Sequence, residues 1–151
     1  MRSFQKFSAR VQTAIDSAPF HINAFPDGTP WIEFYRVEDT YLLRFPGLAD
    51  FSVSNDGTTV TGTPQPGISQ ATLDHLYLNQ VQPLASGKQG ALTYHASAVD
   101  LGPGAIAFLA PAGYGKSTLA AAFAVNGFSF ITDDALVVQR NDTGWMVRPS
   151  H

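Results

Sequence analysis

The sequence has 151 residues and contains no cysteine, which excludes disulfide bonds and thiolate metal sites. Charged residues make up only 14% of the chain, the net charge is −3, and lysine and arginine form no run. This composition argues against a surface that binds nucleic acid.

Long apolar segments are also lacking, and residues 105–110, an apolar run, are far too few to cross a membrane. No apolar run follows Arg2 and Lys6 at the N-terminus, so we expect no secretory signal. These absences predict a cytoplasmic protein without a membrane partner. The hydrophobic content of 44% is enough to supply a core.

The stretch from Phe108 to Phe123 carries the clearest motif. Residues 105–110 predict a buried strand, and a loop with Gly113 and Gly115 follows. The next three residues, Lys-Ser-Thr, open an alanine-rich helix. A strand, a glycine loop and a helix in this order are the context of a phosphate-binding P-loop.

Glycines let backbone N–H groups turn towards an anion, and the helix N-terminus adds free donors and partial positive charge. Lys116 would reach the phosphates of ATP, and the Ser117 hydroxyl would bind Mg²⁺. The alternative is a plain turn that uses its glycines for geometry alone. The residues predicted to bind the nucleotide are Ala112, Gly113, Tyr114, Gly115, Lys116, Ser117 and Thr118.

A second motif follows the predicted strand 128–132, which ends in Asp133 and Asp134. An acid at the end of an apolar strand beside a P-loop holds Mg²⁺, and a second carboxylate can act as general base. The alternative is a simple turn, because residues 135–138 are again strand-like.

His95 interrupts an apolar strand predicted over residues 91–99. A polar residue in a buried strand needs a partner. His95 is therefore either a satisfied core histidine or a side chain that projects towards the phosphate site.

The remaining chain predicts structure without chemistry. Phe4, Phe7, Val11 and Ile15 have helical spacing within residues 1–20, whereas residues 21–66 predict a small antiparallel meander. Ser69 is expected to cap a helix over residues 70–82, whose His75 has no second ligand at metal-binding spacing. The expected domains are a β-rich N-terminal part, residues 1–66, and a core over residues 67–151.

Three linked features resemble the HPr kinase/phosphorylase family, and more closely its shorter relatives, the HPr-kinase-like serine kinases. They are His95-Ala-Ser-Ala-Val99, the loop from Ala110 to Thr118, and Asp133-Asp134 after Gly127. The resemblance covers roughly residues 70–148. It implies an α/β (α+β) fold whose core is of the HPr kinase/phosphoenolpyruvate carboxykinase type.

The resemblance further implies transfer of the ATP γ-phosphate to a serine of an HPr-like protein or a modified-peptide precursor. It implies that Lys116 holds the phosphates, that Ser117 binds Mg²⁺, and that His95 lies near the transferring phosphoryl group. Asp133 and Asp134 become the metal-associated acid and the general base, with Asp134 favoured as base and the order open.

The sequence departs from the family in two ways. Thr118 replaces a glutamate of the bifunctional members, and Ala110-Pro111 replaces their Gly-Asp, so we do not expect phosphorolysis. The family also continues beyond His151 with further acidic, basic and acceptor-binding elements. We therefore expect a truncated core with an incomplete active site, in a piece of a longer protein or a naturally short relative.

The alternatives left open are a nucleotide-binding module or pseudoenzyme, a generic P-loop ATPase, and a β-rich domain with a fortuitous glycine turn. A homo-oligomer is also compatible with the sequence, because an incomplete sheet would expose its edges.

Overall fold

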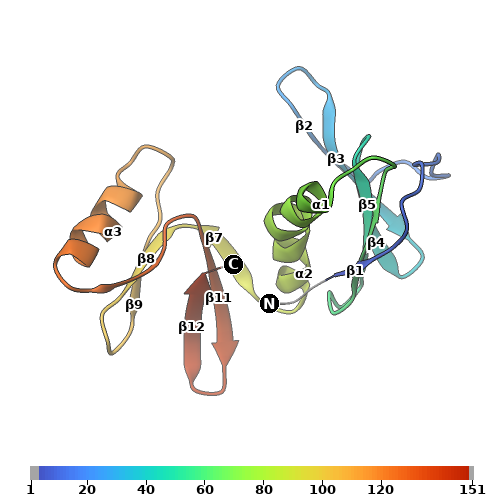
Figure 1. Cartoon of the computed structure of the whole chain (residues 1–151). Helices are drawn as coiled ribbons and strands as arrows, with labels where there is room; N and C mark the ends of the chain where they lie inside the picture. Colours follow the sequence, from blue (N-terminus) through green and yellow to red (C-terminus); the bar gives the residue numbers. More distant parts are fainter. Residues whose placement is uncertain (1–3, 150–151) are drawn as a thin grey trace. The chain divides into compact units, whose positions relative to one another are not determined.

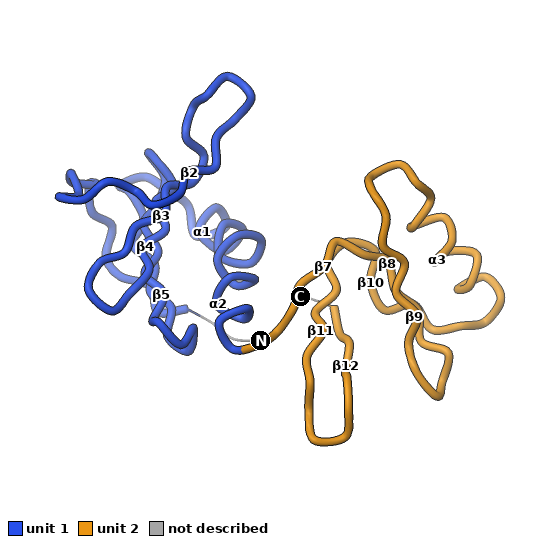
Figure 2. Tube along the Cα trace, turned by 180° about the vertical axis from the view of Figure 1, so that it is seen from behind, with its two compact units in different colours: residues 1–89 blue, residues 90–151 orange. Residues whose placement is uncertain are grey.

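The computed structural model describes residues 4–149. The chain forms two compact units, Met1–Gln89 and Gly90–His151, coloured separately in Figure 2. This division lies further along the chain than the boundary at residues 66/67 that the sequence suggests. The reason is that the helical segment after residue 69 packs on the sheet of the first unit.

The first unit contains a six-stranded sheet in the order β1-β6-β5-β4-β3-β2. Strands β2 to β6 form the expected antiparallel meander, and β1 adds to its edge in parallel with β6. In β5, residues 49, 51 and 53 are buried and alternate with more exposed neighbours, as a half-buried strand requires. The strands are β1 (Gln5–Lys6), β2 (His21–Ala24), β3 (Pro30–Val37), β4 (Thr40–Phe45), β5 (Ala49–Ser54) and β6 (Val60–Pro64).

A helical segment supplies the other half of this core (Figure 1). It consists of α1 (Gln70–Leu76), a π-helical turn η1 (Tyr77–Val81) and α2 (Gln82–Lys88). The predicted cap is confirmed, since the Thr72 N–H donates to Ser69 Oγ over 3.1 Å. The segment continues beyond the predicted end at residue 82, with Pro83 in the first turn of α2.

The helix predicted over residues 1–20 is wrong for the described part, residues 4–20. Phe4 packs against the rings of Phe51 and Tyr77, and the N–H groups of Phe7 and Arg10 donate to carbonyls of the β6 strand. The open edge of β6 therefore determines the conformation of this segment, and local helical periodicity does not.

The second unit contains two three-stranded antiparallel sheets, β10-β8-β9 and β12-β11-β7, and one helix, α3 (Lys116–Val125). Their strands are β7 (Leu92–His95), β8 (Ser97–Asp100), β9 (Ala105–Phe108), β10 (Ser129–Thr132), β11 (Ala135–Asn141) and β12 (Gly144–Pro149). The single strand predicted over residues 91–99 is therefore wrong. The chain passes from one sheet to the other at Ala96, whose N–H donates to the Asp134 carbonyl over 3.1 Å.

The sequence predicts a buried strand over residues 105–110, but the structure places β9 at a sheet edge with residues 105–107 exposed. The small core of this unit comprises Ala96, Ala98 and Leu136 with partly buried neighbours. Several large apolar side chains of the unit are exposed, namely Ile106, Leu109, Leu119, Val125, Phe128, Phe130, Trp145 and Met146.

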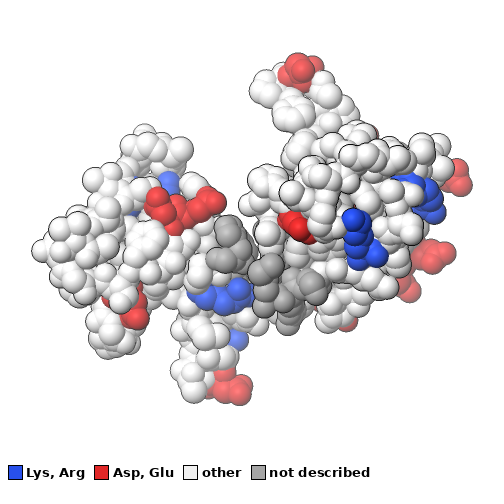
Figure 3. All heavy atoms as spheres, viewed as in Figure 1, with Lys and Arg blue, Asp and Glu red and all other residues white. Residues whose placement is uncertain are grey.

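The fold class is thus α+β with a majority of strands, in agreement with the broader part of the prediction. None of the helices within residues 4–149 has the length and apolar character to cross a membrane. On the face seen in Figure 3, basic and acidic side chains are few and scattered over each unit.

Candidate functional site

The topology of the second unit brings together the ends of strands β9 and β10 and the start of strand β8. Strands β9 and β10 flank β8 and both run antiparallel to it, so their carboxyl ends lie at the end of the sheet where β8 begins. The register pairs Ser97 with Phe108, and Ala98 with Thr132. The loop after β9 and the acidic pair after β10 therefore start beside the first residue of β8.

The loop between β9 and α3 depends on two glycines. Gly113 has φ +84° and Gly115 has φ +82°, a left-handed conformation that other residues rarely adopt, and a Cβ built on either meets nothing within 4 Å. Gly115 is the N-cap of α3 and offers no side chain to cap it. Within residues 4–149, the N–H groups of Lys116, Ser117 and Thr118 have no hydrogen-bond acceptor. Such a helix end is suited to an anion.

Lys116 is unusual among the described residues because it is a buried charged side chain, 8% exposed. Its Nζ donates to the Pro111 carbonyl over 3.3 Å, across the base of the loop. The other predicted loop residues, Ala112, Tyr114, Ser117 and Thr118, are exposed. A cavity of about 350 Å³ adjoins the loop and is lined by residues that include Tyr114, Gly115 and Lys116.

Asp133 lies beside this loop. Its Oδ1 accepts a hydrogen bond of 2.6 Å from the hydroxyl of Ser97. This bond, the neighbouring Ser117 hydroxyl, and the nearby charges of Lys116 and His95 lower the pKa of Asp133. The carboxylate is thus held ionised next to the first turn of α3.

Asp134 points to a different partner. Its Oδ1 lies 3.2 Å from Nδ1 of His95, and both side chains are largely exposed, at 73% and 62%. His95 is thus exposed and contacts the second carboxylate, so it is not a buried core histidine. Both aspartates are exposed and differ in their partners, since Asp133 accepts from Ser97 whereas Asp134 contacts His95.

The donors present fit Mg²⁺ bound together with a nucleotide. Within residues 4–149, no group of three or more acidic, histidine or cysteine side chains could form a metal cage. Mg²⁺ usually takes one or two carboxylates and completes its shell with phosphate oxygens and water. Asp133 and Ser117 supply one carboxylate and one hydroxyl as metal ligands. They lie beside the N–H groups of the loop, which can bind phosphate.

Sequence reasoning missed Ser97 as an individual site residue, although it lies within the His95–Val99 motif. Ser97 and Lys116 are the buried polar or charged residues of the described chain, and both belong to this site. A small polar residue between alanines in an apolar strand was the available signal. His75, in contrast, is exposed and contacts Asn79 on the same helical segment.

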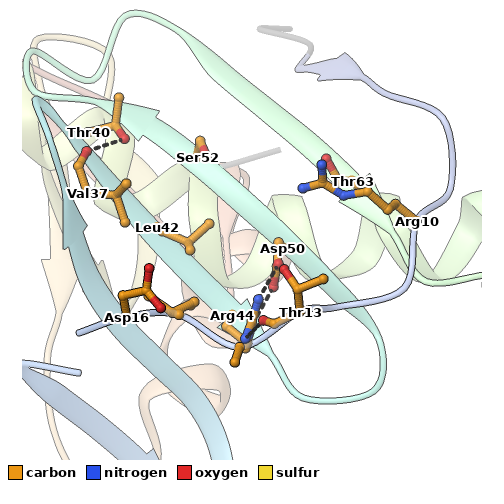
Figure 4. Close-up of a pocket in the computed structure, with 12 residues that line it drawn as sticks. Arg10, Thr13, Asp16, Val37, Thr40, Leu42, Arg44, Asp50, Ser52 and Thr63 are labelled. Atoms are coloured by element: carbon orange, nitrogen blue, oxygen red, sulfur yellow. Dashed lines mark hydrogen bonds and ion pairs between the residues drawn. The ribbon is translucent and has the colours of Figure 1, made fainter. Parts of the chain in front are cut away.

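A separate cavity of about 370 Å³ lies in the first unit, between residues 10–16 and the outer face of the sheet (Figure 4). Arg44, which lines this cavity from strand β4, forms a bidentate ion pair with Asp50. Its two hydrogen bonds are 2.9 and 2.8 Å long. It contains none of the predicted site residues, so the candidate site remains the one in the second unit.

Comparisons of the chain with protein-family models, with curated proteins and with solved structures give no match. We therefore infer a function from the residues and their geometry.

Proposed function

We propose that this chain binds Mg·ATP at the loop between β9 and α3 and transfers the γ-phosphate to a serine hydroxyl of a protein or peptide. The observation that carries the proposal is the convergence of five groups at one end of a small sheet. These are the glycine loop with its free N–H groups, Lys116, Ser117, Asp133 and the pair formed by Asp134 and His95. The resemblance to the HPr-kinase-like proteins supports the same assignment.

The loop side of the site would bind phosphate. The N–H groups at the start of α3 and the ammonium group of Lys116 provide donors and positive charge for the phosphate oxygens. Mg²⁺, held by Ser117 and Asp133, would neutralise charge on the phosphates and help to orient them.

The solvent side of the site would receive the acceptor. Asp134 is exposed, and its contact with His95 gives its carboxylate a defined orientation. In the transfer, the serine oxygen bonds to the γ-phosphorus, the bond to the β,γ-bridging oxygen breaks, and Asp134 takes the hydroxyl proton. The exposure of Asp134 is what an acceptor carried by another molecule requires.

The same exposure favours a second candidate, a P-loop ATPase. Water reaches an open carboxylate as readily as a serine hydroxyl does, and active sites that transfer phosphate to another acceptor commonly exclude it. A nucleotide-binding module without turnover uses the loop side of the site alone.

One experiment separates these functions. The chain is incubated with Mg²⁺ and γ-labelled ATP, with a peptide library that contains one fixed serine or a matched library with alanine there. A serine kinase labels only the serine library, an ATPase releases phosphate equally with both, and a binding module does neither while still binding ATP. A folded chain that fails to bind Mg·ATP would refute the proposal.

A further inference from the structure

We propose that Ser97 is a positioning residue that holds the Asp133 carboxylate towards the loop, where it can bind the metal ion of Mg·ATP. The inference rests on the proposed nucleotide function and names a residue that the predicted motif assigned no role. It concerns how the two adjacent aspartates acquire different tasks.

Three consecutive residues, 95 to 97, contact the Asp133-Asp134 pair. His95 contacts the Asp134 carboxylate at 3.2 Å, the Ala96 N–H donates to the Asp134 carbonyl over 3.1 Å, and Ser97 Oγ donates to Asp133 Oδ1 over 2.6 Å. These contacts come from the point where the chain leaves β7 and enters β8. Neighbouring residues of one segment therefore contact the two carboxylates separately, Ser97 binding Asp133 and His95 contacting Asp134.

Ser97 has the surroundings of a fixed donor. Its side chain is fully buried and lies on the central strand of the β10-β8-β9 sheet, where its rotation is restricted by packing. The pairing of β10 with β8 is irregular between Phe130 and Thr132, directly before the acidic pair. Irregularities of this kind re-aim the side chains that follow, and the Ser97 hydroxyl fixes the result for Asp133.

Without this hydroxyl, Asp133 would lose its 2.6 Å hydrogen bond and could turn to solvent. Hydrogen-bond partners of metal ligands typically contribute about ten- to a hundredfold to metal affinity. The N–H groups and Lys116, which bind phosphate directly, would remain in place. Ser97 should therefore affect the contribution of Mg²⁺ to nucleotide binding and leave metal-free binding unchanged.

The test measures ATP affinity by calorimetry with saturating Mg²⁺ and with EDTA, and uses the ratio of the two affinities. In Ser97→Ala we expect the ratio to fall about tenfold or more, with the EDTA affinity unchanged. Ser97→Thr, which keeps a hydroxyl donor, should restore most of the ratio. The matched control is Thr93→Val, because the Thr93 hydroxyl is buried in the same unit and has no partner. It should leave the ratio at the wild-type value.

Circular dichroism and thermal unfolding establish that each variant is folded. If Ser97→Ala does not fold, Ser97→Cys replaces it as the test variant. A thiol has nearly the volume of the serine hydroxyl but is a weak hydrogen-bond donor, so this variant should also lower the affinity ratio. An unchanged ratio in a folded Ala or Cys variant, or an equal fall of both affinities, would overturn the role of Ser97 alone. A wild-type chain that does not bind Mg·ATP would refute the proposed function, and the inference with it.

Discussion

The two glycines that bracket α3 provide a sharp test of the loop. Gly115 precedes the helix with φ +82°, and Gly127 follows it with φ +93°. A Cβ built on either residue meets nothing within 4 Å, so alanine at either position strains the backbone and creates no clash. The two substitutions should therefore cost similar stability and differ only in their distance from the phosphate site.

A left-handed conformation costs a non-glycine residue roughly 1–2 kcal/mol. For a unit of this size, that loss should lower the unfolding temperature by about 4–8 °C per kcal/mol. At Gly115 the backbone can relieve the strain by turning its N–H groups away from the ligand. Loss of one hydrogen bond to a charged group costs about 1.5–3 kcal/mol, which corresponds to roughly a ten- to hundredfold weaker affinity.

The assay combines thermal unfolding followed by circular dichroism with calorimetric titration of Mg·ATP. Gly115→Ala should lower both the unfolding temperature and the affinity, whereas Gly127→Ala should lower the unfolding temperature alone. Equal losses of affinity in both variants would mean that binding follows the stability of α3. Full affinity in Gly115→Ala would refute the role of the loop backbone in phosphate binding.

Three other changes test separate parts of the account. Asp134→Asn should preserve Mg·ATP affinity and abolish labelling of the serine peptide library, and retained labelling would assign the base elsewhere. Gly62→Ala should destabilise the first unit by about 1–3 kcal/mol in denaturant unfolding, because the new Cβ would lie within 2.9 Å of the Phe4 and Phe51 rings. Hydrogen bonds from neighbouring hydroxyl and N–H groups lower the pKa of Asp56 from 3.8 to about 2, so its stabilising contribution is present above pH 3.8 and is lost as the pH falls towards 2. Asp56→Asn should remove that part of the acid dependence, and a titration of stability against pH with the wild-type slope would contradict this assignment.

The sequence was most informative where local chemistry determines the conformation. The Ser69 cap is such a local signal, and the structure has it as expected. The turn at Asn55-Asp56-Gly57 and the end of α3 at Asn126 are likewise set by residues close together in the chain. The meander also followed from alternating strands separated by turn residues.

The expectations that failed depended on contacts between distant parts of the chain. Residues 4–20 have helical periodicity, but the unpaired edge of β6 offers backbone partners that a helix would not use. Likewise, the apolar residues 91–99 look continuous in sequence, and only the pairing of β7 with β11 and of β8 with β9 reveals the change of sheet at Ala96.

The candidate site shows the same limit. The glycines, Lys116 and the acidic pair are recognisable because their spacing carries a mechanism. The separate orientations of Asp133 and Asp134 could not be predicted, because they depend on a buried hydroxyl and a histidine from another strand. The sequence therefore predicts the candidate residues, and the structure distinguishes their surroundings.

The most direct test of the central claim is calorimetric titration of Mg·ATP into the chain and into Lys116→Ala. Lys116 is buried beneath the loop, and its loss removes the positive charge placed to meet the phosphates. The account predicts binding by the wild-type chain and none, or at least tenfold weaker binding, by the folded variant, which corresponds to about 1.4 kcal/mol or more. Equal affinity of the two proteins for Mg·ATP, or a folded wild-type chain that does not bind, would contradict it.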